Sequence, residues 1–205
     1  MPRGVAITEP RQHLFAAAER VIAAAGPSQL TSRAVTREAG VATGLLFAHF
    51  ANFDDFLTGY AVDRSFQIAA NAAGLAERAG TGTVDANLSE AMLATPMITL
   101  VAVTRLFAYR PTLTEAVEAV LGSGNAALPA LERAVAGNLA AEQHIGRLPT
   151  AADTEALAVA VVGVLHHIAL TDGDDPAAAD RIRRAITALT TATTVNAVAG
   201  RDDGS

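Results

Sequence analysis

Cysteine and lysine are absent from this sequence of 205 residues, and aromatic residues make up only 4% of it. Without cysteine the chain can form neither a disulfide bond nor a thiolate metal site. The start of the sequence also lacks the charged and then apolar pattern of an export signal. These absences together predict a cytoplasmic protein, because a reducing compartment does not favour disulfide bonds.

Long apolar runs are missing as well, since no stretch reaches the roughly 18 apolar residues that a membrane-spanning helix needs. We therefore expect no contact with a membrane. Hydrophobic residues nevertheless form 51% of the chain, enough for a sizeable core in one domain or two small ones. Alanine, leucine and valine dominate and strand-like alternation is scarce, which predicts an all-α fold.

The formal net charge of −6 excludes a protein that coats nucleic acid regardless of sequence. Residues 1–60 are neutral, because five arginines balance five acidic residues and the whole negative excess lies downstream. These residues are Arg3, Arg11, Arg20, Arg33 and Arg37, and Glu9, Glu19, Glu38, Asp54 and Asp55. The distribution fits a DNA-facing head on an acidic body, although a neutral head attracts phosphate weakly. All lysine or arginine positions of the chain are arginine. A bias in the composition of the source genome explains this more simply than function does.

Residues 31–53 carry the clearest functional pattern. They predict a short helix from about Ser32 to Ala39, a tight turn at Gly40 and a second short helix from about Thr43 to Phe50. This is a helix-turn-helix, whose second helix can enter the major groove of DNA. In that helix Leu46 and Phe50 are four residues apart and should face the core. The other side chains should lie on or near the outer surface, namely Thr43, Leu45, Phe47, Ala48 and His49.

The stretch from Pro10 to Leu57, above all the run REAGVATGLLFAHFANFDDFL, resembles the DNA-binding domain of tetracycline-repressor (TetR) family regulators. The typical family run is Ala-Gly-Val-Ser-x-Gly-(Thr/Leu)-(Leu/Ile)-Tyr-x-(His/Tyr)-Phe, followed by a helix that starts with Lys-Glu or Lys-Asp. The resemblance implies phosphate contacts at the positions of Thr31, Ala42, Phe47, His49 and Phe53. It implies base-facing positions at Thr43, Leu45 and Ala48, and it places Arg33 on the DNA side.

Three departures from the family pattern concern phosphate contacts. Ala42 replaces the usual hydroxyl residue, Phe47 replaces a tyrosine, and Phe53 replaces a lysine. Each change removes a hydrogen bond or a charge, so DNA binding should be weaker and less dependent on salt than in a typical member. Thr36 stands where the family usually has alanine, and we expect its hydroxyl to bond back to the preceding helical turn.

Two polar residues of this stretch have alternative interpretations. Thr31 can cap the following helix or donate to a DNA phosphate, and the sequence favours neither. His49 can be an ordinary surface histidine or a phosphate ligand. The surrounding motif favours the phosphate role for His49.

The rest of the chain predicts further helices, about nine in all, and divides the protein into two domains. Residues 1–53 would form the DNA-binding domain, and residues 54–205 a ligand-binding and dimerisation domain. The predicted helix over 154–171 is apolar on every face, which indicates burial all round. Together with the predicted helix over 176–198, it offers the simplest surface for a self-complementary dimer. The resemblance implies the same homodimer, built as a four-helix bundle.

A ligand cavity is expected between the helices of the second domain, with apolar walls and a few polar groups. For each candidate, an ordinary place in the core is the simpler interpretation. The candidates are Phe66, Met92, Met97, Leu100, Thr104, Phe107, Asn125 and His166. Their apolar character predicts a small lipophilic or aromatic effector and no cofactor. His166 and His167 point about 100° apart on a helix and cannot chelate one metal, so burial with hydrogen bonds is favoured and pocket lining is the alternative.

No pattern of an enzyme is present in the sequence. A His-Glu-x-x-His motif and a phosphate-binding glycine loop are both missing, and Gly122-Ser123-Gly124 lacks the strand and helix of a nucleophile elbow. We therefore predict a homodimeric repressor, released from a palindromic operator by a small apolar effector. The alternative is a helical ligand-binding or interaction protein of the same fold with weak or lost DNA binding.

Overall fold

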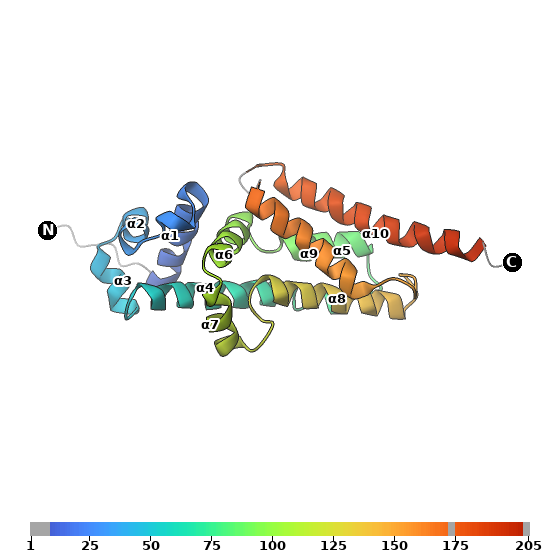
Figure 1. Cartoon of the computed structure of the whole chain (residues 1–205), viewed down its shortest axis with the longest axis horizontal. Helices are drawn as coiled ribbons and strands as arrows, with labels where there is room; N and C mark the ends of the chain where they lie inside the picture. The colour runs from blue at the N-terminus through green and yellow to red at the C-terminus, as the bar shows by residue number, and fades with distance from the viewer. Residues whose placement is uncertain (1–8, 172–174, 203–205) are drawn as a thin grey trace.

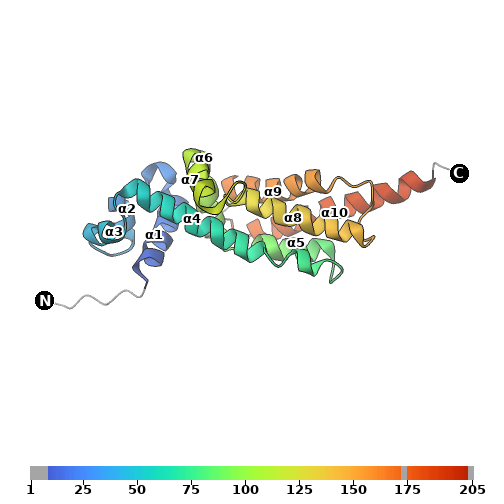
Figure 2. The same cartoon turned by 90° about the horizontal axis from the view of Figure 1, so that it is seen from below.

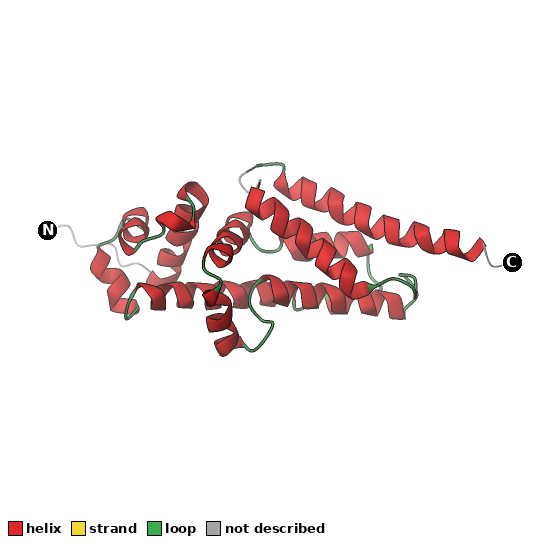
Figure 3. Ribbon diagram, viewed as in Figure 1, coloured by secondary structure: helices red, strands yellow, loops and turns green. Residues whose placement is uncertain are grey.

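The computed structural model describes residues 9–171 and 175–202, and the side chains of these residues as far as residue 192. The described part of the chain contains ten α-helices, two 3-10 turns and no strand, which confirms the all-α prediction (Figure 3). The helices are α1 (Pro10–Ala25), α2 (Ser32–Glu38), α3 (Thr43–His49), α4 (Phe53–Ala72), α5 (Val84–Leu93), α6 (Met97–Tyr109), α7 (Thr112–Leu121), α8 (Leu128–His144), α9 (Thr154–Thr171) and α10 (Ala178–Asp202).

The molecule is elongated, with α1, α2 and α3 forming a head at one end and α10 reaching the other (Figures 1 and 2). Helix α4 leaves the head and runs along the body, where it packs against α7 and α8. Its start is set by Asn52, whose side-chain oxygen accepts a hydrogen bond from the amide of Asp55 at 2.8 Å. The carboxylate of Asp55 accepts in turn from the amide of Ala51 at 2.9 Å. These caps satisfy amides that the first helical turn leaves without partners.

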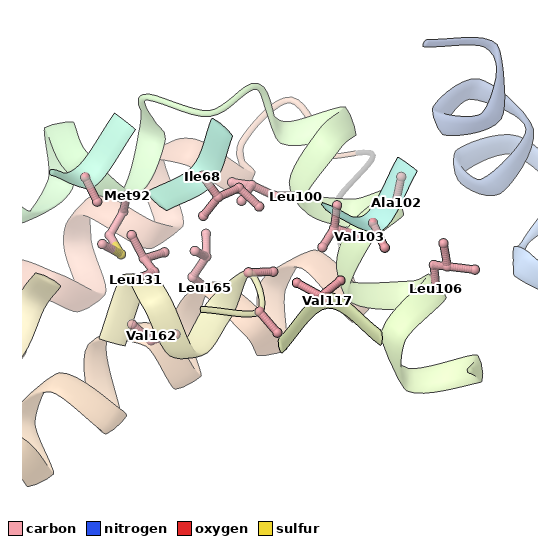
Figure 4. Close-up of a cluster of buried hydrophobic side chains, with 14 of the residues drawn as sticks. Ile68, Met92, Leu100, Ala102, Val103, Leu106, Val117, Leu131, Val162 and Leu165 are labelled. Atoms are coloured by element: carbon pink, nitrogen blue, oxygen red, sulfur yellow. The ribbon is translucent and has the colours of Figure 1, made fainter. Parts of the chain in front are cut away.

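The core of the body lies between α4, α5, α6, α7, α8 and α9. Side chains from all six helices point toward one another there (Figure 4). They include Ile68, Met92, Leu100, Val103, Leu106, Val117, Leu131, Val162 and Leu165. Each large apolar side chain that is fully buried in this way contributes about 1.5–3 kcal/mol to folding.

Helix α9 is not buried all round within the single chain, so its predicted burial is only partly met there. Its inner face packs against α6, α8 and α10, but Val159 is 53% exposed and Leu170 is 37% exposed. The expectation that no stretch could span a membrane also needs correction. By length and composition α9 passes that test, and α5 with α6 pass it only as a pair bent by 73°. The contacts of the inner face of α9 are those of a core helix in a helical bundle.

A buried ion pair connects the head to α4. The guanidinium of Arg64 on α4 donates to the carboxylate of Glu19 on α1 at 2.7 Å, and both side chains are 7% exposed. Burial lowers the pKa of Arg64, but the charge and hydrogen bond of Glu19, together with the nearby Tyr60 and Asp63, outweigh this effect and raise the pKa above its ordinary value. The arginine therefore remains charged, and the pair links the head to the helix that enters the body.

Candidate nucleic-acid interface and ligand cavity

Helix α2 is held by local hydrogen bonds that the sequence only partly predicts. Thr31 caps it, because its hydroxyl oxygen accepts from the amide of Ala34 at 3.1 Å. Thr36 donates to the carbonyl of Ser32 at 2.9 Å, which confirms the predicted bond to the preceding turn. Its oxygen also lies 3.3 Å from the hydroxyl oxygen of Thr43, at the start of α3. This second contact connects the two helices.

The turn between α2 and α3 depends on Gly40. Its φ of 67° lies in the left-handed region, which favours glycine because it has no Cβ. The side chain of His13 on α1 lies within hydrogen-bonding distance of the neighbouring carbonyl of Ala39, at 2.8 Å. These features hold α3 at a set angle to α2, as a helix-turn-helix requires.

An aromatic cluster lies between α1, the end of α3 and the start of α4. The ring centroid of Phe15 on α1 lies 5.6–5.8 Å from those of Phe50, Phe56 and Tyr60. The centroids of Phe50 and Phe56 are 5.1 Å apart. Gly59 allows this approach, because a Cβ there would lie 3.1 Å from the ring of Phe50. The buried rings therefore fix the position of α3 against α1 and α4.

The buried and exposed side chains of α3 are those that the sequence predicts. Leu46 and Phe50 are buried, at 0% and 3% exposure, while Phe47 is 47% exposed. Ala48 and His49 are also exposed, and Thr43 and Leu45 are half-buried. Figure 1 shows α2 and α3 at the end of the molecule opposite the C-terminus, where both can approach a second molecule.

The head is neutral in total, but its positive and negative charges are not balanced on the surface of α2. Glu38 is paired with Arg20 at 2.6 Å, so its negative charge is compensated. Arg33 and Arg37 are exposed on α2, and their side chains make no ion pair or hydrogen bond within the described residues. The surface of α2 thus presents two free cations. Sequence analysis placed only Arg33 on the DNA side, although the four-residue spacing puts Arg37 on the same face.

The departures at Ala42, Phe47 and Phe53 have different structural consequences. Ala42 is the N-cap residue of α3 and provides no side-chain cap. Phe47 keeps its ring exposed without a hydroxyl group. Phe53 is half-buried and stacks on Phe56, with centroids 5.5 Å apart and planes at 18°. Phe53 therefore packs against the aromatic cluster where the family has a charged side chain.

A cavity of about 260 Å³ lies in the body, with almost entirely apolar walls. It lies between α6, α7, the start of α8 and α9, and is lined by Val103, Thr104, Phe107, Ala108, Thr114, Ala126, Ala127, Leu128, Pro129 and His166. Three of the predicted ligand-binding residues therefore come together there, namely Thr104, Phe107 and His166.

The other five candidates lie elsewhere. Met92 and Leu100 point into the shared core (Figure 4), and Met97 is half-buried against that core. Asn125 donates to the carbonyl of Leu121 at 2.7 Å. Phe66 is 61% exposed on α4, because it lies on the side of that helix away from the core. Sequence periodicity could not separate core positions from cavity positions, since both are apolar.

His166 and His167 are both exposed, so the favoured prediction of burial is wrong. His166 instead lines the cavity, as in the alternative interpretation. His167 lies on a neighbouring face and lines a groove between α9 and α10 with Arg181 and Arg184. The two imidazoles thus belong to different surfaces, as their adjacent positions on a helix require.

Residues 14–58 match the family model of the bacterial regulatory proteins of the tetR family. The N-terminal domain is a tetR-family domain. The match covers the helix-turn-helix, α1 and the start of α4, which are the elements that hold the two free arginines and the exposed face of α3. No match is found among curated proteins.

Solved structures extend the likeness beyond the tetR-family domain. A transcriptional regulator from Rhodococcus sp. Rha1 is 21% identical with a TM-score of 0.67, over 93% of this chain and 98% of its own. FadR from Bacillus subtilis, in complex with stearoyl-CoA, is 17% identical with a TM-score of 0.65, over 88% and 97%. A TetR transcription regulator from Haloarcula marismortui is 16% identical with a TM-score of 0.65, over 91% and 99%. At these identities the likeness shows the fold, and the chain has the fold of these regulators over most of its length.

Proposed function

We propose that the protein is a ligand-responsive transcriptional repressor that binds a palindromic operator as a homodimer in the cytoplasm. The observation that carries the proposal is the exposed face of α3 beside the unpaired Arg33 and Arg37 in a tetR-family domain. Two such heads would place α3 in successive major grooves, about 34 to 36 Å apart. In this proposal, residues 1–53 form the DNA-binding domain and residues 54–205 form the ligand-binding and dimerisation domain.

The outer face of α9 supports dimerisation through the last two helices. Val159, Gly163, His166 and Leu170 are exposed and follow the spacing of one helical stripe. Ala185 on α10 lines a groove together with Gly163 of this stripe. A stripe with two apolar side chains and a glycine allows close contact with a second copy, and a twofold axis would pair the stripe with itself.

The position of α6 supports a response to a ligand. Val103 and Thr104 of α6 line the cavity, while the next residue, Arg105, donates to the carbonyl of Ala23 in the head at 3.1 Å. A ligand that shifts α6 would therefore act on the head directly. Moving the equilibrium between two head spacings tenfold takes only about 1.4 kcal/mol of differential affinity. FadR from Bacillus subtilis, which has a similar fold, is found in complex with stearoyl-CoA, and this supports a ligand for the present protein.

Binding of the purified protein to the DNA that flanks its own gene tests the proposal. We expect a retarded complex in a gel-shift assay, lost as salt is raised, and weakened about tenfold by Arg33→Ala or His49→Ala. Arg133→Ala on α8 is the matched control, because Arg133 is an exposed arginine far from the head. Equal binding by the Arg33→Ala, His49→Ala and wild-type proteins would contradict the assigned contacts.

The dimer has its own test, which uses two glycines. Neither Gly163 on α9 nor Gly137 on α8 has an atom within 4 Å of a Cβ position, so arginine fits within the protomer at either site. We expect Gly163→Arg to give monomers in analytical ultracentrifugation and Gly137→Arg to leave the dimer intact. A dimer that survives Gly163→Arg would contradict an interface on α9.

The alternative function is a ligand-binding protein of the same fold with weak or lost DNA binding. The stacking of Phe53 on Phe56 favours it, since this position offers no charge to a phosphate. The absence of any retarded complex even at low salt would support this alternative over the repressor.

A further inference from the structure

We infer that the cavity beside α6 takes a compact, uncharged ligand about the size of a substituted benzene ring, bound through a hydrogen bond to Thr104. The inference rests on the proposed function and assigns the chemical class of the effector. The cavity volume is about 260 Å³. Drug-sized ligands occupy pockets of about 300 to 1,000 Å³. An apolar cavity of about 150 Å³ already takes up benzene, so the volume suits one ring with a small substituent.

Thr104 is a buried threonine on α6 that lines the cavity. It is 3% exposed, and within the described residues its hydroxyl makes no hydrogen bond to another protein group. Thr36 and Thr190, which are also buried on helices, donate to the carbonyls of Ser32 at 2.9 Å and Ile186 at 3.1 Å. A hydroxyl that faces an apolar cavity without a protein partner is unfavourable unless water or a ligand forms a hydrogen bond with it. An oxygen or nitrogen atom of a ligand would provide that partner.

Two other polar side chains of the cavity wall also orient the ligand. Thr114 and His166 line the cavity, and neither side chain has a hydrogen-bond partner among the residues that the structure describes. His166 is exposed in the single chain, so it lies on the open side of the cavity, next to the proposed dimer interface. A ligand with one polar group would direct it inward to Thr104, and a second polar group could reach Thr114 or His166.

The wall is poorly suited to a charged ligand. Among the described residues, no arginine, aspartate or glutamate lines the cavity, and His166 is the one lining residue that can carry a charge. An unpaired charge moved out of water into apolar surroundings is strongly unfavourable. The same reasoning excludes a long acyl-CoA of the kind bound by FadR, whose phosphates would lack cations here. Each carbon group of a stearoyl chain is about the size of a water molecule, which occupies about 30 Å³. The whole chain therefore exceeds the volume of the cavity.

Calorimetric titration of the full-length protein with p-cresol and toluene tests the inference. The two molecules differ only in the hydroxyl group. We expect p-cresol to bind about tenfold more tightly than toluene, and this difference to fall below about twofold in Thr104→Val. Thr104→Ser should keep the difference because it retains the hydroxyl. Thr99→Val is the matched control, since Thr99 is buried on the same helix but does not line the cavity.

A second variant tests the location without changing the core. Ala108 lines the cavity but is exposed, so Ala108→Phe can fill the cavity without overpacking the core. We expect Ala108→Phe to abolish p-cresol binding with little change in melting temperature. Benzoate and stearoyl-CoA should not bind the wild-type cavity measurably.

Several results would overturn the inference. They are no binding of p-cresol, equal binding of p-cresol and toluene, p-cresol binding that persists in Ala108→Phe, or benzoate or stearoyl-CoA binding that Ala108→Phe removes. Operator binding is measured separately in the gel-shift assay. A protein that binds p-cresol but no DNA would therefore support this inference and contradict the repressor. A protein that binds DNA but no p-cresol would support the repressor and contradict this inference.

Discussion

The hydroxyl oxygens of Thr36 and Thr43 lie 3.3 Å apart and connect α2 to α3. Thr36 donates to the carbonyl of Ser32 at 2.9 Å, which uses its only proton. Thr43 must then be the donor in the contact between the two hydroxyls. The lone pairs of Thr43 remain free, so in a major groove it would accept a hydrogen bond from the exocyclic amine of adenine or cytosine.

This arrangement predicts that Thr36 influences base preference although it is buried. In Thr36→Val the hydroxyl of Thr43 loses its acceptor and becomes free to donate to the O6 of guanine or the O4 of thymine. We expect similar affinity for a mixture of operators but a changed preference at one base pair in each half-site. Fluorescence anisotropy with operators substituted at single positions measures this. An unchanged preference would mean that Thr43 does not read a base through this hydroxyl.

Two substitutions toward the family pattern should strengthen DNA binding. Phe53→Lys restores a cation, and we expect about tenfold tighter binding at low salt with a salt slope steeper by about one unit. It should also lower stability by about 0.5–1.5 kcal/mol or more, because the stack on Phe56 is lost. Phe47→Tyr adds a hydroxyl to an exposed ring and should tighten binding less, without a change in stability. Weaker DNA binding by both variants would contradict the predicted phosphate positions.

The ion pair of Glu19 and Arg64 should be critical for folding. Arg64→Leu leaves the carboxylate of Glu19 buried without its cation, so it should cost about 3–5 kcal/mol of unfolding free energy. Glu19→Leu should cost less, because Arg64 keeps an ion pair with Asp63 at 2.6 Å. The double variant should lose less than the sum of the two. The exposed pair of Arg20 and Glu38 provides the contrast, since Arg20→Ala should cost only about 0.2–1 kcal/mol. Urea unfolding curves distinguish these outcomes, and equal small losses in all variants would contradict the role of the buried pair.

Tyr60 predicts a loss of stability at high pH. Burial, together with the nearby carboxylate of Glu19, raises the pKa of its hydroxyl well above the ordinary value of about 10. The folded chain therefore holds this proton when the unfolded chain has already lost it. Its contribution to stability is complete below about pH 10 and decreases above it, by up to about 1.4 kcal/mol per pH unit, until the pH passes the folded pKa.

Urea unfolding between about pH 9 and pH 11.5 measures this effect. We expect Tyr60→Phe to lose less stability over this range than the wild type. The other tyrosine of the chain, Tyr109, is 54% exposed, and Tyr109→Phe serves as the control. Identical pH dependence in the Tyr60→Phe and wild-type proteins would contradict the assignment to Tyr60.

Local patterns in the sequence were sufficient for the helix-turn-helix and the outer face of α3. The four-residue spacing of Leu46 and Phe50 acts within about one helical turn. Such interactions depend on neighbours in the chain, so periodicity and residue type predict them. The resemblance over residues 10–57 is confirmed by the match over residues 14–58 for the same reason.

Contacts between distant segments were decided only by the tertiary structure. Arg64 meets Glu19 across 45 residues of the chain, and no spacing rule specifies this ion pair. Apolar periodicity also cannot say which face of α9 meets a neighbour or which apolar residues surround a cavity. Three-dimensional packing left Val159 and His166 outside and brought His166 to Thr104 and Phe107. Sequence alone thus determined the helix-turn-helix, while packing between helices determined the cavity and the exposed stripe of α9.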